Sequence, residues 1–152
     1  MTDAANDVAE AEIVCEASRE HLAQLLAFVD RACARAGLDQ EVLFDVRLAV
    51  EEVVTNVIEH GYRGMATGPV TVRFRRDPRQ VVVTVEDLAR PFDPALVARP
   101  DRTAPLEQRP IGGLGWHLVR QVMDDVRHEQ LTTHGTSHGN RVTLVKRLSA
   151  TD

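Results

Sequence analysis

The chain has 152 residues and a formal net charge of −5 with neutral histidines. This length fits one domain, which buries roughly 68–70% of the surface of its unfolded chain. The acidic balance disfavours binding to a phosphate backbone, and the basic cluster Arg73, Arg75 and Arg76 is confined to one short segment. We therefore expect no nucleic-acid partner.

The N-terminus and the cysteines indicate an intracellular protein. Residues 1–10 are acidic and alanine-rich without the features of a secretory signal, and we expect them to be disordered ahead of a single domain over residues 11–149. No segment approaches the ~18 consecutive apolar residues of a membrane span, so we expect a cytoplasmic protein with no membrane partner. Cys15 and Cys33 lack metal-ligand spacing, which predicts free, buried thiols, with a disulfide as the minor alternative.

The first elements in chain order are a strand and two helices. Residues 11–17 contain an Ile-Val pair typical of a strand. Ser18 is a suitable N-cap for an amphipathic helix that ends at Gly37, and Asp39 can cap a longer helix that ends at Gly61. Apolar residues recur at helical spacing along both helices, so each has one face for the core.

The apolar period then changes to two. Alternation over residues 70–75 and 81–85, separated by an Asp-Pro turn, predicts a β-hairpin. Residues 88–111 contain five prolines and no clear period, which is typical of a long functional loop.

The last part of the chain predicts a helix and a second hairpin. Helical spacing covers residues 114–123, and residues 125–130 and 141–148 predict strands around a turn at residues 134–140. Two histidines lie in this turn, where a solvated loop is favoured over a metal site. The element order predicts an α+β two-layer sandwich, with helices on one face of a mixed, mostly antiparallel sheet.

Glu52 and Asn56 are the first candidate functional residues. They lie four residues apart in the second predicted helix and project to the same side, about 6 Å apart along the axis. An amide oxygen can ligate a divalent cation, and a carboxylate with an ordinary pKa near ~4.3 can accept a proton from a hydroxyl group. A solvated helix face is the simpler interpretation of the glutamate, but asparagine is unfavourable in mid-helix and favours a shared function.

Asp87 and a glycine-rich segment supply two further candidates. Asp87 ends the second predicted hairpin strand, where a carboxylate can accept from an exocyclic amine such as that of adenine; a turn residue is the simpler alternative. Gly112, Gly113 and Gly115 open the next helix, whose free amide groups favour a phosphate. None of the three motifs identifies a function alone, but together they provide what bound Mg-ATP needs.

Four segments carry a resemblance to a known family. They read Glu-Val-Val-Thr-Asn-(x)3-His-Gly-Tyr from residue 52, Asp-Leu-Ala-Arg-Pro-Phe-Asp-Pro from residue 87, Gly-Gly-Leu-Gly-Trp-His-Leu-Val-Arg-Gln-Val-Met-Asp-Asp-Val from residue 112, and Gly-Asn-Arg-Val-Thr-Leu-Val-Lys-Arg from residue 139. Their order and spacing, over roughly residues 41–148, resemble the anti-sigma-factor serine/threonine kinases of bacterial partner-switching systems. These kinases belong to the GHKL (Bergerat) ATPase superfamily.

The resemblance implies a Bergerat ATP-binding fold that uses ATP and Mg2+. It implies that Glu52 is the general base, Asn56 the Mg2+ ligand and Asp87 the acid that reads adenine. The other implied site residues are the phosphate-facing glycines and a basic residue before them: Gly113, Gly115 and Arg109. Family members phosphorylate a STAS-domain anti-anti-sigma factor and sequester a sigma factor or another regulator, and the same resemblance leads us to expect a homodimer formed through the sheet region.

Two departures from the family pattern leave alternatives open. Ala89 stands where the family usually has glycine, and Gly139-Asn140 replaces a Gly-Thr pair. The methyl group of Ala89 could crowd adenine or forbid a positive φ, which would favour a catalytically weak or inactive module that acts only by protein sequestration. The presence of both Glu52 and Asn56 in the second helix favours an active kinase over such a module. The catalytic half of a histidine kinase is a third alternative, and residues 1–35 disfavour it because they predict no dimerising helix with a phosphoacceptor histidine.

Overall fold

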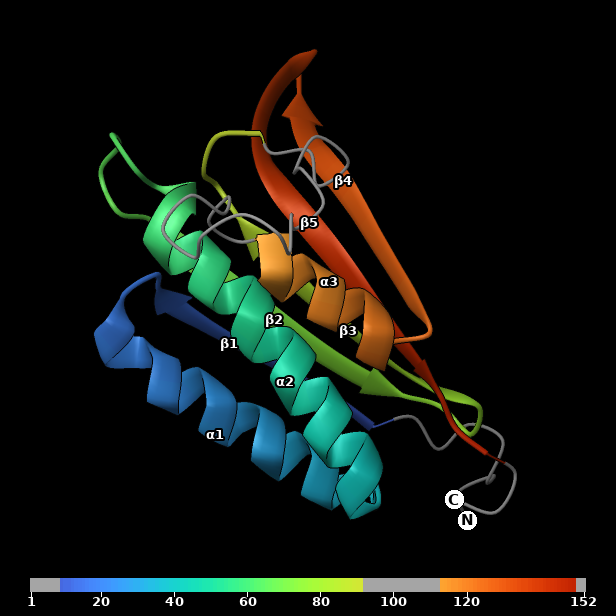
Figure 1. The fold of residues 1–152 in the computed structure, drawn as a ribbon. Coiled ribbons are helices and arrows are strands. Elements are labelled where there is room, and N and C mark those ends of the chain that lie inside the picture. The colour runs from blue at the N-terminus through green and yellow to red at the C-terminus, as the bar shows by residue number, and fades with distance from the viewer. Residues whose placement is uncertain (1–8, 92–112, 150–152) are drawn as a thin grey trace, which may run out of the picture.

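The structure, a computed structural model, describes residues 9–91 and 113–149. Its elements are β1 (Ala9–Glu16), α1 (Arg19–Arg35), α2 (Gln40–Asn56), a π-helical turn η2 (Val57–Gly61), β2 (Pro69–Arg76), β3 (Gln80–Asp87), α3 (Gly113–Val122), β4 (Asp125–Thr133) and β5 (Thr136–Arg147). The predicted order of strand, two helices, hairpin, helix and hairpin is confirmed (Figure 1).

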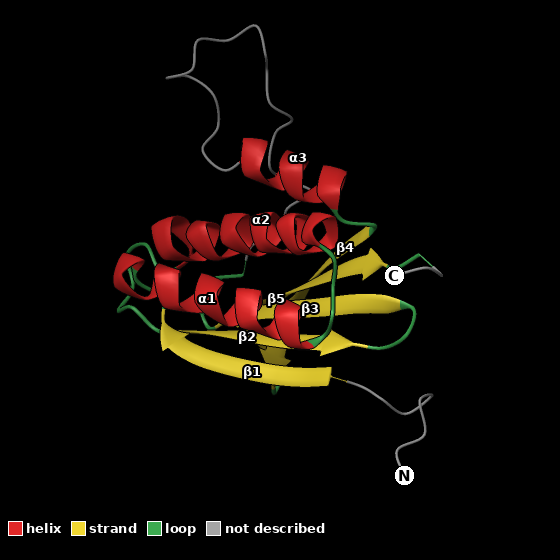
Figure 2. Cartoon of the chain, turned by 90° about the horizontal axis from the view of Figure 1, so that it is seen from below, coloured by secondary structure: helices red, strands yellow, loops and turns green. Residues whose placement is uncertain are grey.

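Within the described residues, five strands form one sheet in the order β1-β2-β3-β5-β4. Helices α1, α2 and α3 lie on one face of this sheet and leave the other face open (Figure 2). The predicted α+β two-layer sandwich is therefore confirmed. The sheet is antiparallel throughout and not mixed, because two helices in succession connect β1 to β2 and the chain re-enters the sheet in the opposite direction.

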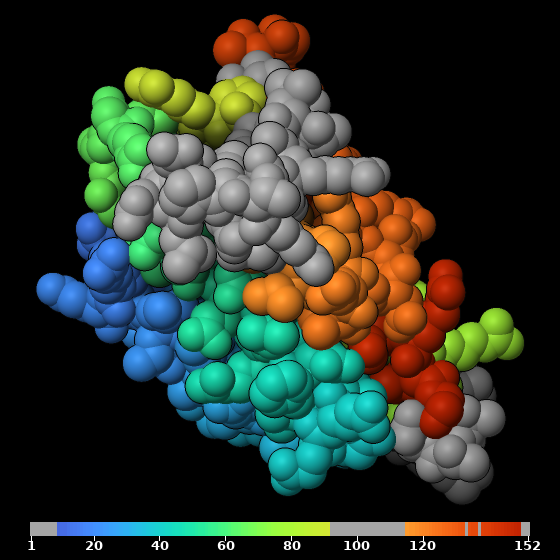
Figure 3. Space-filling view, in the orientation of Figure 1, coloured from blue at the N-terminus to red at the C-terminus, as the bar shows by residue number. Residues whose placement is uncertain are grey.

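The core lies between the sheet and the helices. Alternate residues of β2 and β3 point into it, as the period of two predicted, and none is more than 2% exposed: Val70, Val72, Phe74, Val81, Val83 and Val85. The surface view shows α1 and α2 side by side, with α3 next to α2 (Figure 3). Among the described residues, no helix is long and apolar enough to cross a membrane.

Both predicted N-caps precede a helix, but their side chains make different contacts. The Oδ1 atom of Asp39 accepts a hydrogen bond from the backbone N–H of Val42 at 2.8 Å, as expected for an N-cap. The hydroxyl of Ser18 instead lies 2.7 Å from Nδ1 of His21. A local side-chain contact therefore replaces the backbone cap at the start of α1.

The sheet begins earlier than the sequence pattern suggested. Ala9 and Glu10, expected in the disordered N-terminus, are the first two residues of β1. They pair with Arg76 and Arg75 of β2, so the hydrogen-bonded ladder extends to the end of its neighbour. Residues 1–8 lie outside the described part of the chain.

The turn between β4 and β5 is shorter than predicted. It consists of His134 and Gly135, with φ angles of 52° and 79°. Residues 136–140, expected in the turn, belong to β5 because they pair with β4 as far as Gln130 and Asn140. In the longer strand Asn140 lies opposite Asp87, the last residue of β3.

The two cysteine thiols are free and buried, as predicted. Burial, and secondarily the neighbouring carboxylate of Asp30, raises the pKa of Cys33 to about 12. Burial also raises the pKa of Cys15. Neither thiol therefore has the thiolate character of a reactive cysteine.

Tyr62 connects the end of the α2 region to the ends of two strands. Its hydroxyl donates to the backbone oxygen of Pro69 at 2.6 Å and accepts from the backbone N–H of Leu88 at 2.8 Å. A Cβ atom at Gly68 would lie 2.7 Å from the Tyr62 ring, so glycine is needed there. Tyr62 thus fixes the backbone that follows Asp87.

We expect Tyr62→Phe to destabilise the fold by about 1 kcal/mol, because a part-buried backbone N–H and a part-buried carbonyl oxygen lose their partner. The phenyl ring should preserve the packing. Urea unfolding followed by circular dichroism measures the change as a lower midpoint with an unchanged slope. An unchanged midpoint would show that the hydroxyl contacts contribute nothing net to stability.

Candidate functional site

Glu52 and Asn56 line one small cavity beside α2. This cavity of about 90 Å³ is also lined by Gly115 and Trp116 of α3. The predicted orientation of the two α2 side chains toward a common space is therefore observed. Because α3 forms the opposite wall, residues more than fifty positions apart in sequence meet here.

Asn56 also lines a second, larger cavity, together with Asp87. That cavity has a volume of about 250 Å³ and extends to Asn140 and His128. Four residues line both cavities: Val53, Asn56, His60 and Trp116. The two cavities therefore adjoin, and an elongated ligand can reach from the carboxylate of Glu52 to that of Asp87.

The helix that carries Asn56 changes its geometry immediately after this residue. Residues 57–61 form the π-helical turn η2, whereas the sequence predicted an α-helix to Gly61. Single π-helical turns occur frequently at functional sites. Nδ1 of His60 accepts from Nη2 of Arg63 at 3.2 Å, because arginine can only donate, and His60 faces both cavities.

Burial shifts the protonation of Glu52. Desolvation, with smaller contributions from the negative charges of Glu51 and Glu59, raises the pKa of Glu52. The expectation of an ordinary pKa is therefore wrong. The direction of the shift makes this carboxylate a stronger base than an exposed glutamate once it is ionised.

Asp87 ends β3, as predicted, and is only 6% exposed. Burial raises its pKa, while hydrogen bonds from Asn140 and from the backbone of Ala89 oppose the rise. Its Oδ1 atom accepts from both donors at 2.9 Å. A buried carboxylate with a fixed orientation at the wall of a cavity is suited to reading a polar ligand group.

Ala89 does not create the obstacle that its methyl group suggested. Among the described non-glycine residues only His134 has a positive φ, so Ala89 adopts an ordinary backbone conformation. Ala89 is 1% exposed and lines neither cavity. A Cβ atom at Gly61 would lie 3.3 Å from its methyl group, so Gly61 provides the space that the methyl group occupies.

Gly115 lies directly against the carboxylate of Glu52. A Cβ atom at this position would lie 2.6 Å from Oε2 of Glu52. The far end of α3 is held by Lys146, whose Nζ donates to the backbone oxygen of Val122 at 2.7 Å and pairs with Asp45 of α2 at 2.8 Å. Lys146 thus ties the end of α3 to α2, while Gly115 lets the start of α3 approach Glu52 closely.

The structure describes only part of the predicted phosphate-binding segment. Gly113 is the first residue of α3, so the predicted helix start is observed. Arg109 and Gly112 lie outside the described residues, as does the proline-rich segment 92–112. In the described ranges, no three His, Cys, Asp or Glu side chains gather where they could together hold a metal ion.

Sequence reasoning missed His128 as a site residue. It lies on β4 and lines the larger cavity with Arg63 and Arg90. Its position depends on β4 pairing with β5 and β5 pairing with β3. Strand order is not visible in the local pattern around a histidine, and the sequence offered no signal for it.

Comparison with known proteins shows that the chain is similar to ATPase domains. The model of the histidine kinase-like ATPase domain family matches residues 15–146. The anti-sigma F factor of Clostridium novyi is 32% identical over 117 residues, which cover 72% of this chain and 74% of that factor. The serine-protein kinase RsbW of Bacillus subtilis is 28% identical over 138 residues, or 85% of each chain.

Other relatives match over a shorter length. The serine-protein kinase RsbW of Listeria innocua is 34% identical over 100 residues, so the chain spans only 62% of the length of that kinase, and 62% of this chain is covered. Among solved structures, the RsbU and RsbW domains of Rv1364c from Mycobacterium tuberculosis align with a TM-score of 0.65 and 18% identity, covering 91% of this chain and 32% of the other. That likeness supports the fold alone.

Proposed function

Because the chain belongs to the histidine kinase-like ATPase domain family, in the group that contains RsbW kinases and anti-sigma F factors, we propose that it is an ATP-dependent protein serine/threonine kinase and anti-sigma-type switch. In this proposal residues 9–149 form a single cytoplasmic kinase domain, which starts two residues earlier than predicted because β1 begins at Ala9. It phosphorylates a STAS-domain anti-anti-sigma factor and sequesters a sigma factor or an equivalent regulator.

One observation carries the proposal. The carboxylate of Glu52, the amide of Asn56 and the carboxylate of Asp87 line two adjoining cavities that Asn56 connects. A nucleoside triphosphate is an elongated ligand with a polar base at one end and a reacting phosphoryl group at the other. The buried carboxylate of Asp87 suits the purine end of this ligand. The carboxylate of Glu52, beside Gly115, suits the phosphoryl end.

The chemistry follows from the side chains at the reacting end. Glu52 accepts the proton of the partner's serine or threonine hydroxyl as the hydroxyl oxygen attacks the γ-phosphorus and the bond to the departing ADP oxygen breaks. Positioning of the hydroxyl, the phosphoryl group and the base accounts for most of the rate. Gly115 leaves the space that keeps the Glu52 carboxylate beside the start of α3.

Asn56 is the proposed ligand of a magnesium ion. Its amide supplies an oxygen at the junction of the two cavities, and Mg2+ prefers oxygen ligands with several of its waters and substrate phosphates retained. The residues present fit this ion without a further cluster of protein ligands. When bound, Mg2+ neutralises charge on the β- and γ-phosphates.

The direct test mixes the protein with candidate STAS-domain proteins and Mg-ATP. The proposal expects mass spectrometry to find a phosphoryl group on one serine or threonine of a partner. Trp116, the single tryptophan, lines both cavities, so its fluorescence should change when Mg-ATP is added. Binding without transfer to any partner would favour sequestration alone, and the absence of binding would overturn the nucleotide site.

The sequestration-only alternative rested on Ala89. Its methyl group packs toward Gly61 and its backbone N–H donates to Asp87, so Ala89 supports the purine end of the site. We therefore favour the active kinase. A homodimer through the sheet region stays part of the proposal, and light scattering of the purified chain measures it.

We expect the rate of phosphotransfer to depend on pH through Glu52. The base must be deprotonated, and burial raises its pKa, so the rate should fall on acidification at a pH above the ordinary glutamate value of about 4.3. Single-turnover transfer measured between mildly acidic and neutral pH tests this. A rate that stays constant down to the ordinary glutamate range would contradict a raised pKa in the base.

We expect Gly115→Ala to separate activity from stability. The new Cβ would lie 2.6 Å from Oε2 of Glu52, and the flexible carboxylate can move away, so the melting temperature should change little. A displaced base should lower the transfer rate by about 10–100-fold. Melting curves and single-turnover assays on the same preparation measure both effects, and full activity would mean that the Glu52 position tolerates the shift.

A further inference from the structure

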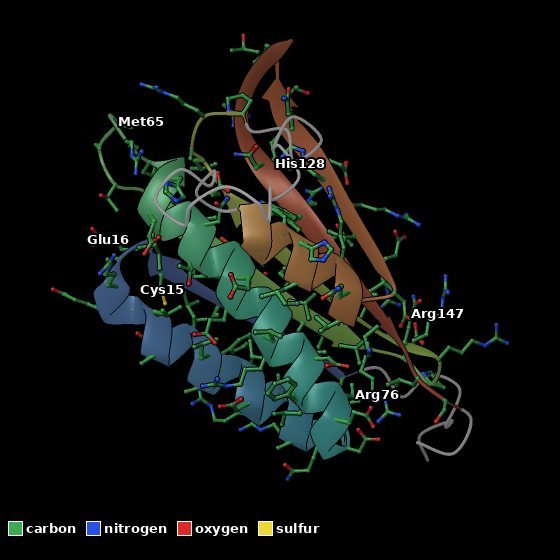
Figure 4. All side chains as sticks on the ribbon, in the orientation of Figure 1. Cys15, Glu16, Met65, Arg76, His128 and Arg147 are labelled. Atoms are coloured by element: carbon green, nitrogen blue, oxygen red, sulfur yellow. The ribbon has the colours of Figure 1, made fainter. Side chains whose placement is uncertain are left out.

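A chain of polar contacts that crosses β3, β5 and β4 holds Asp87. Its Oδ1 atom accepts from the backbone N–H of Ala89 and from Nδ2 of Asn140, both at 2.9 Å. The same Nδ2 donates to the backbone oxygen of Arg90 at 2.8 Å. Nε2 of His128, which Figure 4 labels on β4, lies 2.9 Å from Oδ1 of Asn140.

The acceptors around Asn140 fix the direction of these contacts. A carboxylate and a backbone carbonyl oxygen only accept, so the NH2 group of Asn140 faces Asp87 and Arg90. Its Oδ1 atom therefore faces His128 and accepts, which assigns a proton to Nε2 of that imidazole. Both amide hydrogens of Asn140 are engaged, so this residue influences a ligand through Asp87.

Gly139 allows β5 to approach the end of β3 closely enough for these contacts. Its φ is +155°, and a Cβ atom would lie 2.3 Å from the backbone oxygen of Asp87. Any other residue would push the two strands apart. Asp87 and Asn140 face each other in the strand register and are 6% and 5% exposed.

The contacts leave one oxygen of Asp87 for a ligand. In the described part of the chain, Oδ1 receives two donors and no donor contacts Oδ2. Asp87, Asn140 and His128 all line the cavity of about 250 Å³. A ligand in that cavity therefore meets a single acceptor whose direction the neighbouring amides determine.

Building on the proposed function, we propose that Asn140 and His128 are positioning residues that set the base preference of the site. They hold the carboxylate of Asp87 so that its Oδ2 atom accepts from the amino group of a 6-aminopurine. A 6-ketopurine brings an acceptor against that acceptor and leaves both groups buried without a donor, so the site rejects it. A purely structural role for the pair at the strand ends would leave base preference unchanged.

The experiment compares two nucleotides that differ at this purine position, ATP and inosine triphosphate, each with Mg2+, by titration calorimetry. Asn140→Ala should weaken ATP binding about 10-fold and bring the two affinities within about 3-fold of each other. His128→Ala should act in the same direction by about 3-fold, because Oδ1 of Asn140 then loses one of the contacts that fix the orientation of the amide. His128→Gln should restore the preference, since a glutamine N–H can donate to the same oxygen.

His134→Asn is the matched control, because it replaces a histidine of the same hairpin that lines neither cavity. It should retain the wild-type preference. If Asn140→Ala does not fold, the two His128 variants decide the question. Folded variants that retain the wild-type preference would overturn the positioning role.

The outcomes for the wild-type protein separate the two proposals. Preferential ATP binding supports both. Equal binding of ATP and inosine triphosphate overturns the base preference while the nucleotide site stands. Binding of neither nucleotide overturns the nucleotide site and the inference with it.

Discussion

Glu52→Gln should lower the rate of phosphotransfer by about 10²–10⁴-fold and leave nucleotide affinity close to that of the wild type. Glutamine has nearly the same shape, so the cavity that Glu52 lines with Gly115 and Trp116 is preserved. The amide cannot accept the hydroxyl proton at neutral pH, which removes the base alone. Single-turnover transfer to a cognate STAS-domain protein and calorimetry with Mg-ATP measure the two effects.

The neighbouring glutamate provides the matched control. Glu51 is next to Glu52 on α2, pairs with Arg47 at 3.8 Å and lines neither cavity. Glu51→Gln removes the same charge from the same helix, and we expect transfer within about 3-fold of wild type because the pair is exposed. Transfer by Glu52→Gln at the wild-type rate would remove this residue from the mechanism and leave the nucleotide site intact.

Local sequence patterns were sufficient to predict the elements and part of the site. The four-residue spacing of Glu52 and Asn56 places both on one face of a helix whatever the tertiary structure, and the period of two places Asp87 at a strand end. These relations depend on neighbours in sequence. They are therefore also found in the structure.

Relations between distant segments were not predictable in the same way. The support of Asp87 by Asn140 and His128 depends on the strand order β3-β5-β4 and on the register of each pair. The space for the Ala89 methyl group depends on Gly61, which the sequence pattern used only as a helix end. The raised pKa of Glu52 depends on burial by α3, which a glutamate-rich helix segment does not reveal.

The contacts around Asp87 also predict how a single atom exchange should change the ligand. Asp87→Asn keeps the side-chain shape and replaces one oxygen by an NH2 group. Two donors, the backbone of Ala89 and the amide of Asn140, already point at Oδ1, so the remaining oxygen of the new asparagine must stay there. The NH2 group then takes the place of Oδ2, and the cavity presents a donor instead of an acceptor.

We expect Asp87→Asn to weaken ATP binding by about 10–100-fold, because the 6-amino group of adenine then meets another donor. Binding of inosine triphosphate should improve, since its 6-keto oxygen accepts from the new NH2 group, and the order of the two affinities should reverse. Asp77→Asn is the control: Asp77 accepts from the backbone N–H of Arg79 at 2.8 Å in the β2–β3 turn, a role that asparagine also fills. A reversal requires that the amide of Asn140 keep its orientation, which Arg90 and His128 enforce from two sides. An equal loss of affinity for both nucleotides would show that the Asn140 amide turns when the carboxylate is removed.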